Sequence, residues 1–76
     1  MKEFVEYIVK KLVDRPDEVS INEIQGEKTI VLELRVGDGE LGKVIGKNGR
    51  IAQSIRTLLT ATSAKSNKRV VLEILE

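Results

Sequence analysis

The glycines of this chain are concentrated in one short segment that also carries basic side chains. Five of the six glycines lie between Val36 and Arg50. Glycine lets a backbone approach an anion closely, and a Lys or Arg side chain neutralises the anion's charge. Glycine-rich basic segments are therefore typical of phosphate-binding sites. Three phosphate-related patterns overlap here and have to be weighed against one another.

Two of these patterns belong to nucleotide-binding enzymes, and neither fits. The run Gly37-Asp38-Gly39-Glu40-Leu41-Gly42 matches the dinucleotide pattern G-x-G-x-x-G, but its two acids would repel a pyrophosphate. No Asp or Glu follows between Leu41 and Leu72 to bind the ribose. The run Gly42–Asn48 resembles a P-loop, yet it is one residue short and Asn48 replaces the magnesium-binding hydroxyl. The rest of the chain is also too short for a nucleotide-binding domain.

The third pattern is G-x-x-G, at Gly46-Lys47-Asn48-Gly49, between two helical patterns. A tight junction between helices needs backbone conformations that glycine reaches cheaply. The following helix would point its free N–H groups and the positive end of its dipole at an anion held by the loop. Lys47 and Arg50 add positive charge, and Asn48 adds amide donors. Taken alone, a plain turn between two helices explains the same string.

Composition excludes most catalytic chemistry. The 76 residues include no Cys and no His, which removes disulfides, the usual zinc sites, and the Ser–His and Cys–His nucleophile pairs. We therefore expect no metal, no cofactor and no enzymatic activity. The net charge is only +1, but residues 41–72 carry seven basic residues and no acid. This asymmetry indicates an anionic partner.

No apolar run approaches the ~20 residues that would span a bilayer, and the charged N-terminus is followed by no signal segment. We expect a soluble cytoplasmic protein with no membrane association.

Hydrophobic periodicity predicts an α+β fold in the order α-β-β-α-α-β, forming a single domain over residues 1–76. A three-stranded sheet with helices packed on one face would bury the apolar stripes together. The expected elements are a helix over Lys2–Asp14 ended by Pro16, a strand over Glu18–Gln25 with a break in alternation at Ile24 like that of a β-bulge, a turn at Gly26–Lys28, a strand over Thr29–Val36, a short helix around Leu41–Ile45, a helix over Arg50–Ala64, a basic loop at Lys65–Lys68 and a strand over Arg69–Leu75.

The segment Gly42–Ile55 resembles the core of a KH domain. That family has the pattern V-I-G-x-x-G, then a basic residue, then an aliphatic helix position, and Val44–Ile51 matches each of these positions. The predicted element order resembles the type II, or prokaryotic, arrangement, whose three strands form a mixed sheet. The resemblance covers essentially the whole chain and is closest to the small bacterial single-KH RNA-binding proteins, the KhpA family.

The resemblance implies an RNA-binding protein, and an RNA chaperone, that clamps about four nucleotides of single-stranded RNA in a groove beside the G-x-x-G loop. It also implies pairing with a second copy or with another KH-containing RNA-binding protein. The RNA-binding residues that it implies are Gly42, Lys43, Ile45, Gly46, Lys47, Asn48, Gly49, Arg50, Ile51, Gln53, Ser54 and Arg35.

Within this set, Lys47 and Asn48 would face the phosphates, and Ile45 and Ile51 would form an apolar floor for the bases. Arg35 would stand in the opposite wall, supplied by the strand Thr29–Val36. Two further residues are expected outside the site: Arg56 in solvent beyond the reach of a short bound strand, and Glu40 as a cap on the short helix.

Two alternatives stay open. The same scaffold serves as a protein-interaction or dimerisation module in KH domains whose loop is degenerate, although this loop is intact and basic. Single-stranded DNA is a second candidate ligand, because phosphate contacts and apolar base packing do not require the 2′-hydroxyl. One Tyr and one Phe provide no stacking platform for bases.

Overall fold

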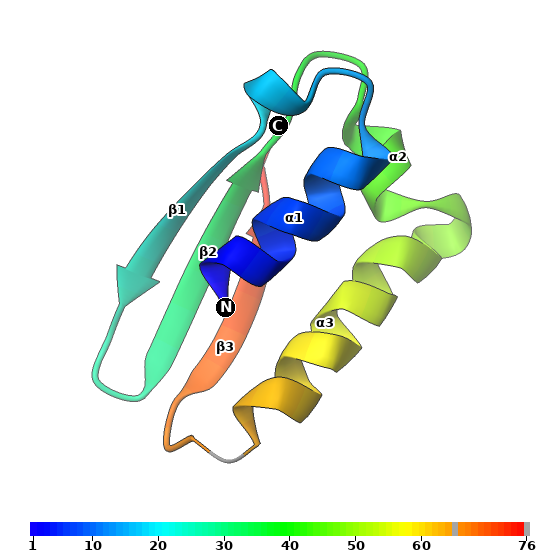
Figure 1. Ribbon diagram of the computed structural model, residues 1–76. Coiled ribbons are helices and arrows are strands. Elements are labelled where there is room, and N and C mark those ends of the chain that lie inside the picture. The colour runs from blue at the N-terminus through cyan, green and yellow to red at the C-terminus, as the bar shows by residue number, and fades with distance from the viewer. Residues whose placement is uncertain (65, 76) are drawn as a thin grey trace.

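Helices cover one face of a three-stranded sheet in the computed structural model, which describes residues 1–64 and 66–75 (Figure 1). The elements are α1 (Lys2–Leu12), the 3₁₀ turn η1 (Pro16–Glu18), β1 (Ser20–Gln25), β2 (Thr29–Arg35), α2 (Leu41–Ile45), the 3₁₀ turn η2 (Lys47–Gly49), α3 (Arg50–Ser63) and β3 (Arg69–Ile74). The order α-β-β-α-α-β is confirmed. Lys65, expected in a basic loop, lies outside the described residues.

The sheet is mixed, with strand order β1-β2-β3. β1 and β2 form an antiparallel hairpin, and β2 and β3 are parallel. The parallel pair requires a crossover, which α2 and α3 supply. β2 is therefore the central strand, and β3 is an edge strand that packs against α3.

The core lies between the helices and this sheet. It is built from Val5 and Val9 of α1, Leu32 and Leu34 of β2, Val44 of α2, Ile55 and Leu59 of α3, and Leu72 of β3. Each aliphatic side chain of this size stabilises the fold by about 1.5–3 kcal/mol when fully buried. Alternate residues of β2 face this core, so Val31, Glu33 and Arg35 lie on the opposite, uncovered face.

Three local expectations were wrong. β1 begins at Ser20 because Pro16, whose fixed φ suits the start of a helical turn, begins η1 instead. There is no bulge at Ile24, which pairs with Val31 in unbroken register and lies on the uncovered face of the sheet. Helical spacing predicts Phe4 and Leu58 on the apolar stripes of the helices over Lys2–Asp14 and Arg50–Ala64, but these two side chains are 39% and 45% exposed.

Within the described part of the chain, every helix is too short or too polar to cross a bilayer.

Candidate nucleic-acid interface

The loop between α2 and α3 has a tightly fixed backbone. Gly46, Asn48 and Gly49 have φ angles of 78°, 58° and 73°. The Gly46 N–H donates to the Gly42 carbonyl at 2.9 Å, and the Gly49 N–H donates to the Gly46 carbonyl at 3.1 Å. These bonds make the loop a hydrogen-bonded turn rather than a loose connection.

Gly46 is required by both conformation and packing. Its φ of 78° and ψ of 172° fall in a region that is essentially restricted to glycine. A Cβ at this position would lie 2.6 Å from Cγ1 of Ile51. The Ile51 side chain therefore packs directly beneath the loop backbone. Asn48 adopts the left-handed region, which Asn tolerates better than most residues.

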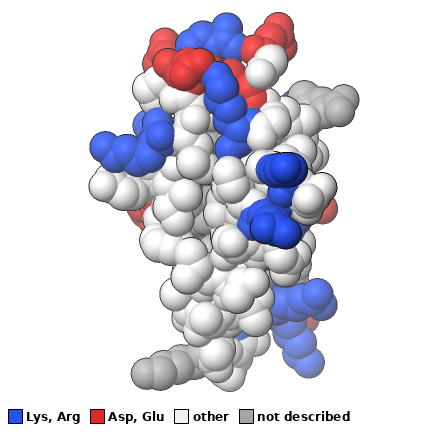
Figure 2. Space-filling model, turned by 90° about the vertical axis from the view of Figure 1, so that its right-hand side faces the viewer, with Lys and Arg blue, Asp and Glu red and all other residues white. Residues whose placement is uncertain are grey.

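The loop presents positive charge at the start of α3. Lys47, Asn48 and Arg50 are exposed, and no carboxylate among the described residues pairs with Lys47 or Arg50. No side chain in the described chain caps the N-terminus of α3, so its terminal N–H groups add to the field. On the face shown in Figure 2, acidic side chains gather mainly at one end, and only small parts of acidic side chains show at the edges elsewhere on this face.

Ile45 and Ile51 are both half-buried, and Ile51 also packs against the core. Gln53 is exposed on the first turns of α3. The Ser54 hydroxyl donates to the Arg50 carbonyl at 2.8 Å, which leaves its lone pairs to accept a hydrogen bond. Together these side chains continue the surface of the loop along α3.

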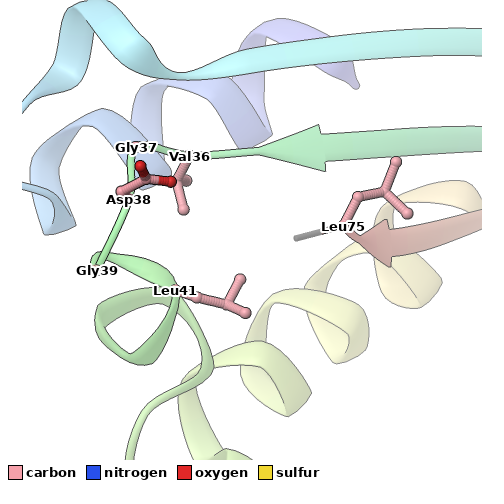
Figure 3. A pocket seen from close by; sticks show the side chains of 6 residues that line it. All are labelled: Val36, Gly37, Asp38, Gly39, Leu41 and Leu75. Carbon is pink, nitrogen blue, oxygen red and sulfur yellow. The ribbon is translucent and has the colours of Figure 1, made fainter.

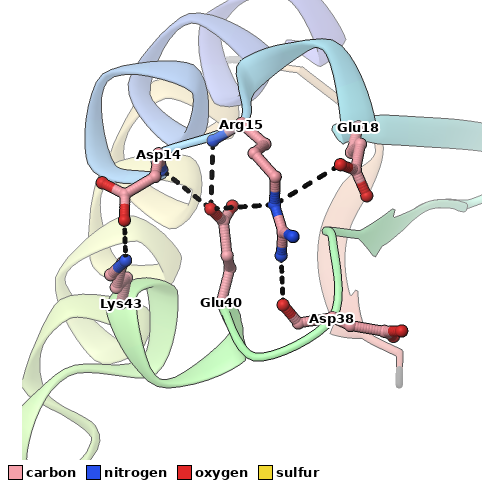
Figure 4. Close-up of polar contacts among 6 residues, drawn as sticks. All are labelled: Asp14, Arg15, Glu18, Asp38, Glu40 and Lys43. Carbon is pink, nitrogen blue, oxygen red and sulfur yellow. Dashed lines mark hydrogen bonds and ion pairs between the residues drawn. The ribbon is translucent and has the colours of Figure 1, made fainter.

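Lys43 is held away from this surface by an ion pair. Its ammonium group donates to the carboxylate of Asp14, at the end of α1 (Figure 4). The hydrogen bond and charge of Lys43 lower the pKa of Asp14 from its ordinary value. A phosphate would therefore have to compete with Asp14 for Lys43.

Arg35 does not share a face with the loop. It lies on the central strand, whose two edges are both paired, and on the sheet face opposite to the buried Leu34. The strand Thr29–Val36 thus lies inside the sheet and not across from the loop. The strand that α3 packs against is β3.

Arg56 is exposed, as expected, but its guanidinium also spans two elements. Its Nη2 donates to the backbone carbonyl of Leu72 on β3 at 3.3 Å. No sequence pattern predicts this contact, because it depends on how α3 docks against the strand.

Glu40 was expected to cap α2, and it does occupy the N-cap position, but its side chain makes no capping hydrogen bond. Its carboxylate is buried, with 3% of the residue exposed, and makes no bond to the helix. Oε1 instead accepts the backbone N–H groups of Asp14 and Arg15, each at 3.0 Å (Figure 4). The Arg15 guanidinium lies 3.4 Å from Oε1, bridges to Glu18 and donates to the Asp38 carbonyl. This Glu40 clamp fixes the start of α2 to the end of α1.

A pocket of about 200 Å³ lies at the other end of α2 from the loop. The Leu41 side chain projects across it in the direction of Leu75, and Asp38 also lines it (Figure 3). It overlaps the G-x-G-x-x-G string at Gly37–Gly42. An apolar wall with an acidic rim does not suit a pyrophosphate, which agrees with the rejection of that pattern.

Comparisons with known proteins agree with this geometry. The chain is 62% identical to "RNA-binding protein KhpA" of Aquifex aeolicus, over all of this chain and 96% of the relative. It is 60% identical to the protein of the same name from Borreliella burgdorferi, over 97% of this chain and 90% of the relative. For the Clostridium perfringens protein of that name the identity is 56%, over 99% of this chain and the whole relative. No solved structure matches the chain significantly. The family model described as "KhpA/KhpB, KH domain" matches residues 2–74, and the chain therefore belongs to the KhpA/KhpB family of KH domains.

Proposed function

We propose that this protein binds single-stranded RNA, holding about four nucleotides beside the Gly46–Gly49 loop. The observation that carries the proposal is the loop itself, a fixed glycine turn with exposed Lys47 and Arg50 at the uncapped start of α3. The relatives' printed name, "RNA-binding protein KhpA", supports RNA as the ligand. It is a binding protein and not an enzyme.

Binding would depend on phosphate contacts at the loop and on apolar contacts to bases. Lys47, Asn48 and the N–H groups at the start of α3 would contact phosphates, and Ile45 and Ile51 would support the bases. Each phosphate neutralised on a single strand contributes about −0.7 to the slope of log K against log salt. Two to four contacts therefore predict moderate affinity that falls clearly with salt.

The test is fluorescence anisotropy with a labelled eight-nucleotide RNA, at two salt concentrations. The variant Lys47→Asp with Asn48→Asp keeps both glycines, and Asp tolerates the left-handed conformation of residue 48. A matched control, Lys2→Asp with Lys10→Gln, makes the same change in net charge on α1, away from the loop. We expect the loop variant to lose binding and the α1 control to keep most of it.

Equal loss in both variants would mean that net charge, and not the loop, governs binding. Equal retention would mean that the loop is only a turn. The same oligonucleotide made as DNA separates RNA from single-stranded DNA as the preferred ligand.

A short site also favours a paired working unit. Two linked sites raise avidity without any new contact, and this is the basis for proposing a second copy, or another KH-containing RNA-binding protein, as partner. The exposed Phe4, Tyr7 and Leu58 offer apolar surface for such a contact. Sedimentation should then show self-association, or association with that partner, at micromolar concentration. A strict monomer with tight RNA binding would exclude it. Cytoplasmic RNA chaperoning is the role that we propose for the pair.

A further inference from the structure

The outer edge of β3, beside α3, carries backbone hydrogen-bonding groups that pair with no other strand of the sheet. The N–H groups of Arg69 and Leu75 donate toward β2, to Lys28 at 2.9 Å and Leu34 at 2.8 Å. In a strand, the backbone groups of alternate residues point to opposite sides. The N–H and C=O of Leu72 therefore point away from β2, to the outer edge of the sheet.

Arg56 occupies the junction between α3 and this edge. Its Nη2 donates to the Leu72 carbonyl at 3.3 Å, longer than the 2.9–3.0 Å typical of a strong bond. A guanidinium has five N–H donors, and no carboxylate among the described residues pairs with this one. The contact with Leu72 thus fixes where the guanidinium lies while leaving most of its donors for a ligand.

Arg56 lies within the length of the proposed RNA site. It lies seven residues after Gly49 on α3, which at 1.5 Å per residue is about 10 Å along the helix axis. Nucleotides stacked as in a duplex are spaced about 3.4 Å apart, which is a lower bound for a single strand in a groove, so four nucleotides span at least about 10 Å. A four-nucleotide strand that starts at the loop and follows α3 would therefore reach Arg56.

The chemistry of a guanidinium selects among bases. Two neighbouring N–H donors of the fork need two adjacent acceptors on one edge of a base. Guanine offers O6 and N7, and cytosine offers N3 and O2, on edges that are accessible in a single strand. In adenine the amino group lies beside both N1 and N7, so each of these acceptors has a donor as its neighbour. In uracil an N–H lies between the two carbonyl groups. Neither presents an adjacent acceptor pair.

We infer that Arg56 is a specificity-determining residue that reads one base of the bound segment and favours cytosine or guanine over adenine or uracil. This inference rests on the proposed RNA binding at the loop. It assigns Arg56 to base recognition, whereas Lys47 and Arg50 serve phosphate attraction.

The test uses four labelled RNAs, U8 and the same octamer with one central C, G or A. Because the octamer is longer than the site, the protein can bind it in the register that places the single favoured base at Arg56. We expect the C- and G-containing RNAs to bind about five-fold or more tightly than the A-containing RNA and U8, since one bidentate pair discriminates by ~1–3 kcal/mol.

Arg56→Lys keeps the positive charge and loses the forked pair of N–H donors. It should abolish the preference while changing U8 affinity by less than about two-fold.

Arg69→Lys is the matched control, an exposed arginine on β3 that should keep the preference. Equal binding of all four RNAs, with binding still lost in the Lys47→Asp, Asn48→Asp variant, would overturn the inference and leave the proposed function intact. Persistence of the preference in Arg56→Lys would also overturn it. Failure of the native protein to bind any of the four RNAs would overturn both. A merely structural role at the strand edge would alter the stability of Arg56→Lys and not the ratio of affinities.

Discussion

Gly46 should be the glycine of this chain that is least able to accept a side chain. Its backbone region costs about 1–3 kcal/mol for any residue with a Cβ. In Gly46→Ala the new Cβ would also lie 2.6 Å from Cγ1 and 2.9 Å from Cβ and Cδ1 of Ile51. Overpacking of this kind adds about 1–3 kcal/mol. We expect Gly46→Ala to lower the free energy of unfolding by about 3 kcal/mol. In a domain of this size that loss corresponds to a fall in Tm of about 12 °C or more.

Two other glycines provide graded controls. Gly49→Ala has a positive φ of 73° but no atom within 4 Å of the added Cβ, so only the backbone cost of about 1–2 kcal/mol applies. Gly42→Ala lies in α2 with open space around its Cβ, and should leave stability unchanged or raise it by up to about 1 kcal/mol. Urea unfolding followed by circular dichroism measures all three, because the chain has no Trp for fluorescence.

The reasoning would be refuted if Gly46→Ala and Gly49→Ala were equally destabilised. The contact with Ile51 would then contribute nothing to the need for glycine. A double-mutant cycle tests the same contact independently. Ile51→Ala removes Cγ1 and Cδ1, two of the three crowded atoms, so Gly46→Ala should cost about 1 kcal/mol less in that background.

Three further predictions concern the Glu40 clamp, the ion pair of Lys43 and the loop conformation. Glu40→Ala should lower the free energy of unfolding by about 3 kcal/mol in urea titrations, because two backbone N–H groups lose a buried charged acceptor. Glu40→Gln, which keeps an acceptor oxygen, should cost less. The pKa of Asp14 is lowered in the folded state, so the Lys43 pair stabilises the fold above the ordinary value of 3.8 and loses this effect as pH falls through the lower folded value. Acid titrations should therefore show native protein and Asp14→Asn differing slightly at neutral pH and converging in acid, below the ordinary value of 3.8; a gap that widens in acid would contradict this. Asn48→Gly should be neutral or slightly stabilising in thermal unfolding, and Asn48→Val should cost about 1–2 kcal/mol, since φ is 58°. Equal Tm values for these two variants would show that residue 48 does not hold the left-handed conformation.

The sequence predicted the elements well where a local pattern governed them. The alternation at Ile30, Leu32 and Leu34 placed β2, and the helical spacing of Ile55 and Leu59 placed α3, because burial on one face dictates these periods. The start of β1 was misplaced because the 3₁₀ turn that begins at Pro16 extends to Glu18, a residue that had been assigned to the strand. The exposure of Ile24 could not be read from alternation, since it depends on which sheet face the helices leave open.

The side-chain contacts that were not predicted join residues far apart in the sequence. Glu40 binds backbone groups 25 and 26 residues away, and Arg56 binds a carbonyl 16 residues away. No periodicity or spacing encodes such contacts, because they arise when separate elements dock. The loop was predictable for the opposite reason. Its glycines, its basic residues and the helix that follows are contiguous.

The docked structure also revises the apparent charge of the site. Residues 41–72 carry seven basic side chains, but Lys43 is neutralised by Asp14, and Lys68 donates to Gln25 at 3.3 Å. Arg56 lies at the edge of β3, where the inference above assigns it to a base and not to a phosphate. Lys47 and Arg50 are the cations that stand at the loop. If these two supply the phosphate contacts, the slope of log K against log salt should be about −1.4. If all seven contacted phosphate it would be about −5, and a slope of that size would show that RNA binds along the whole basic segment and not at the loop.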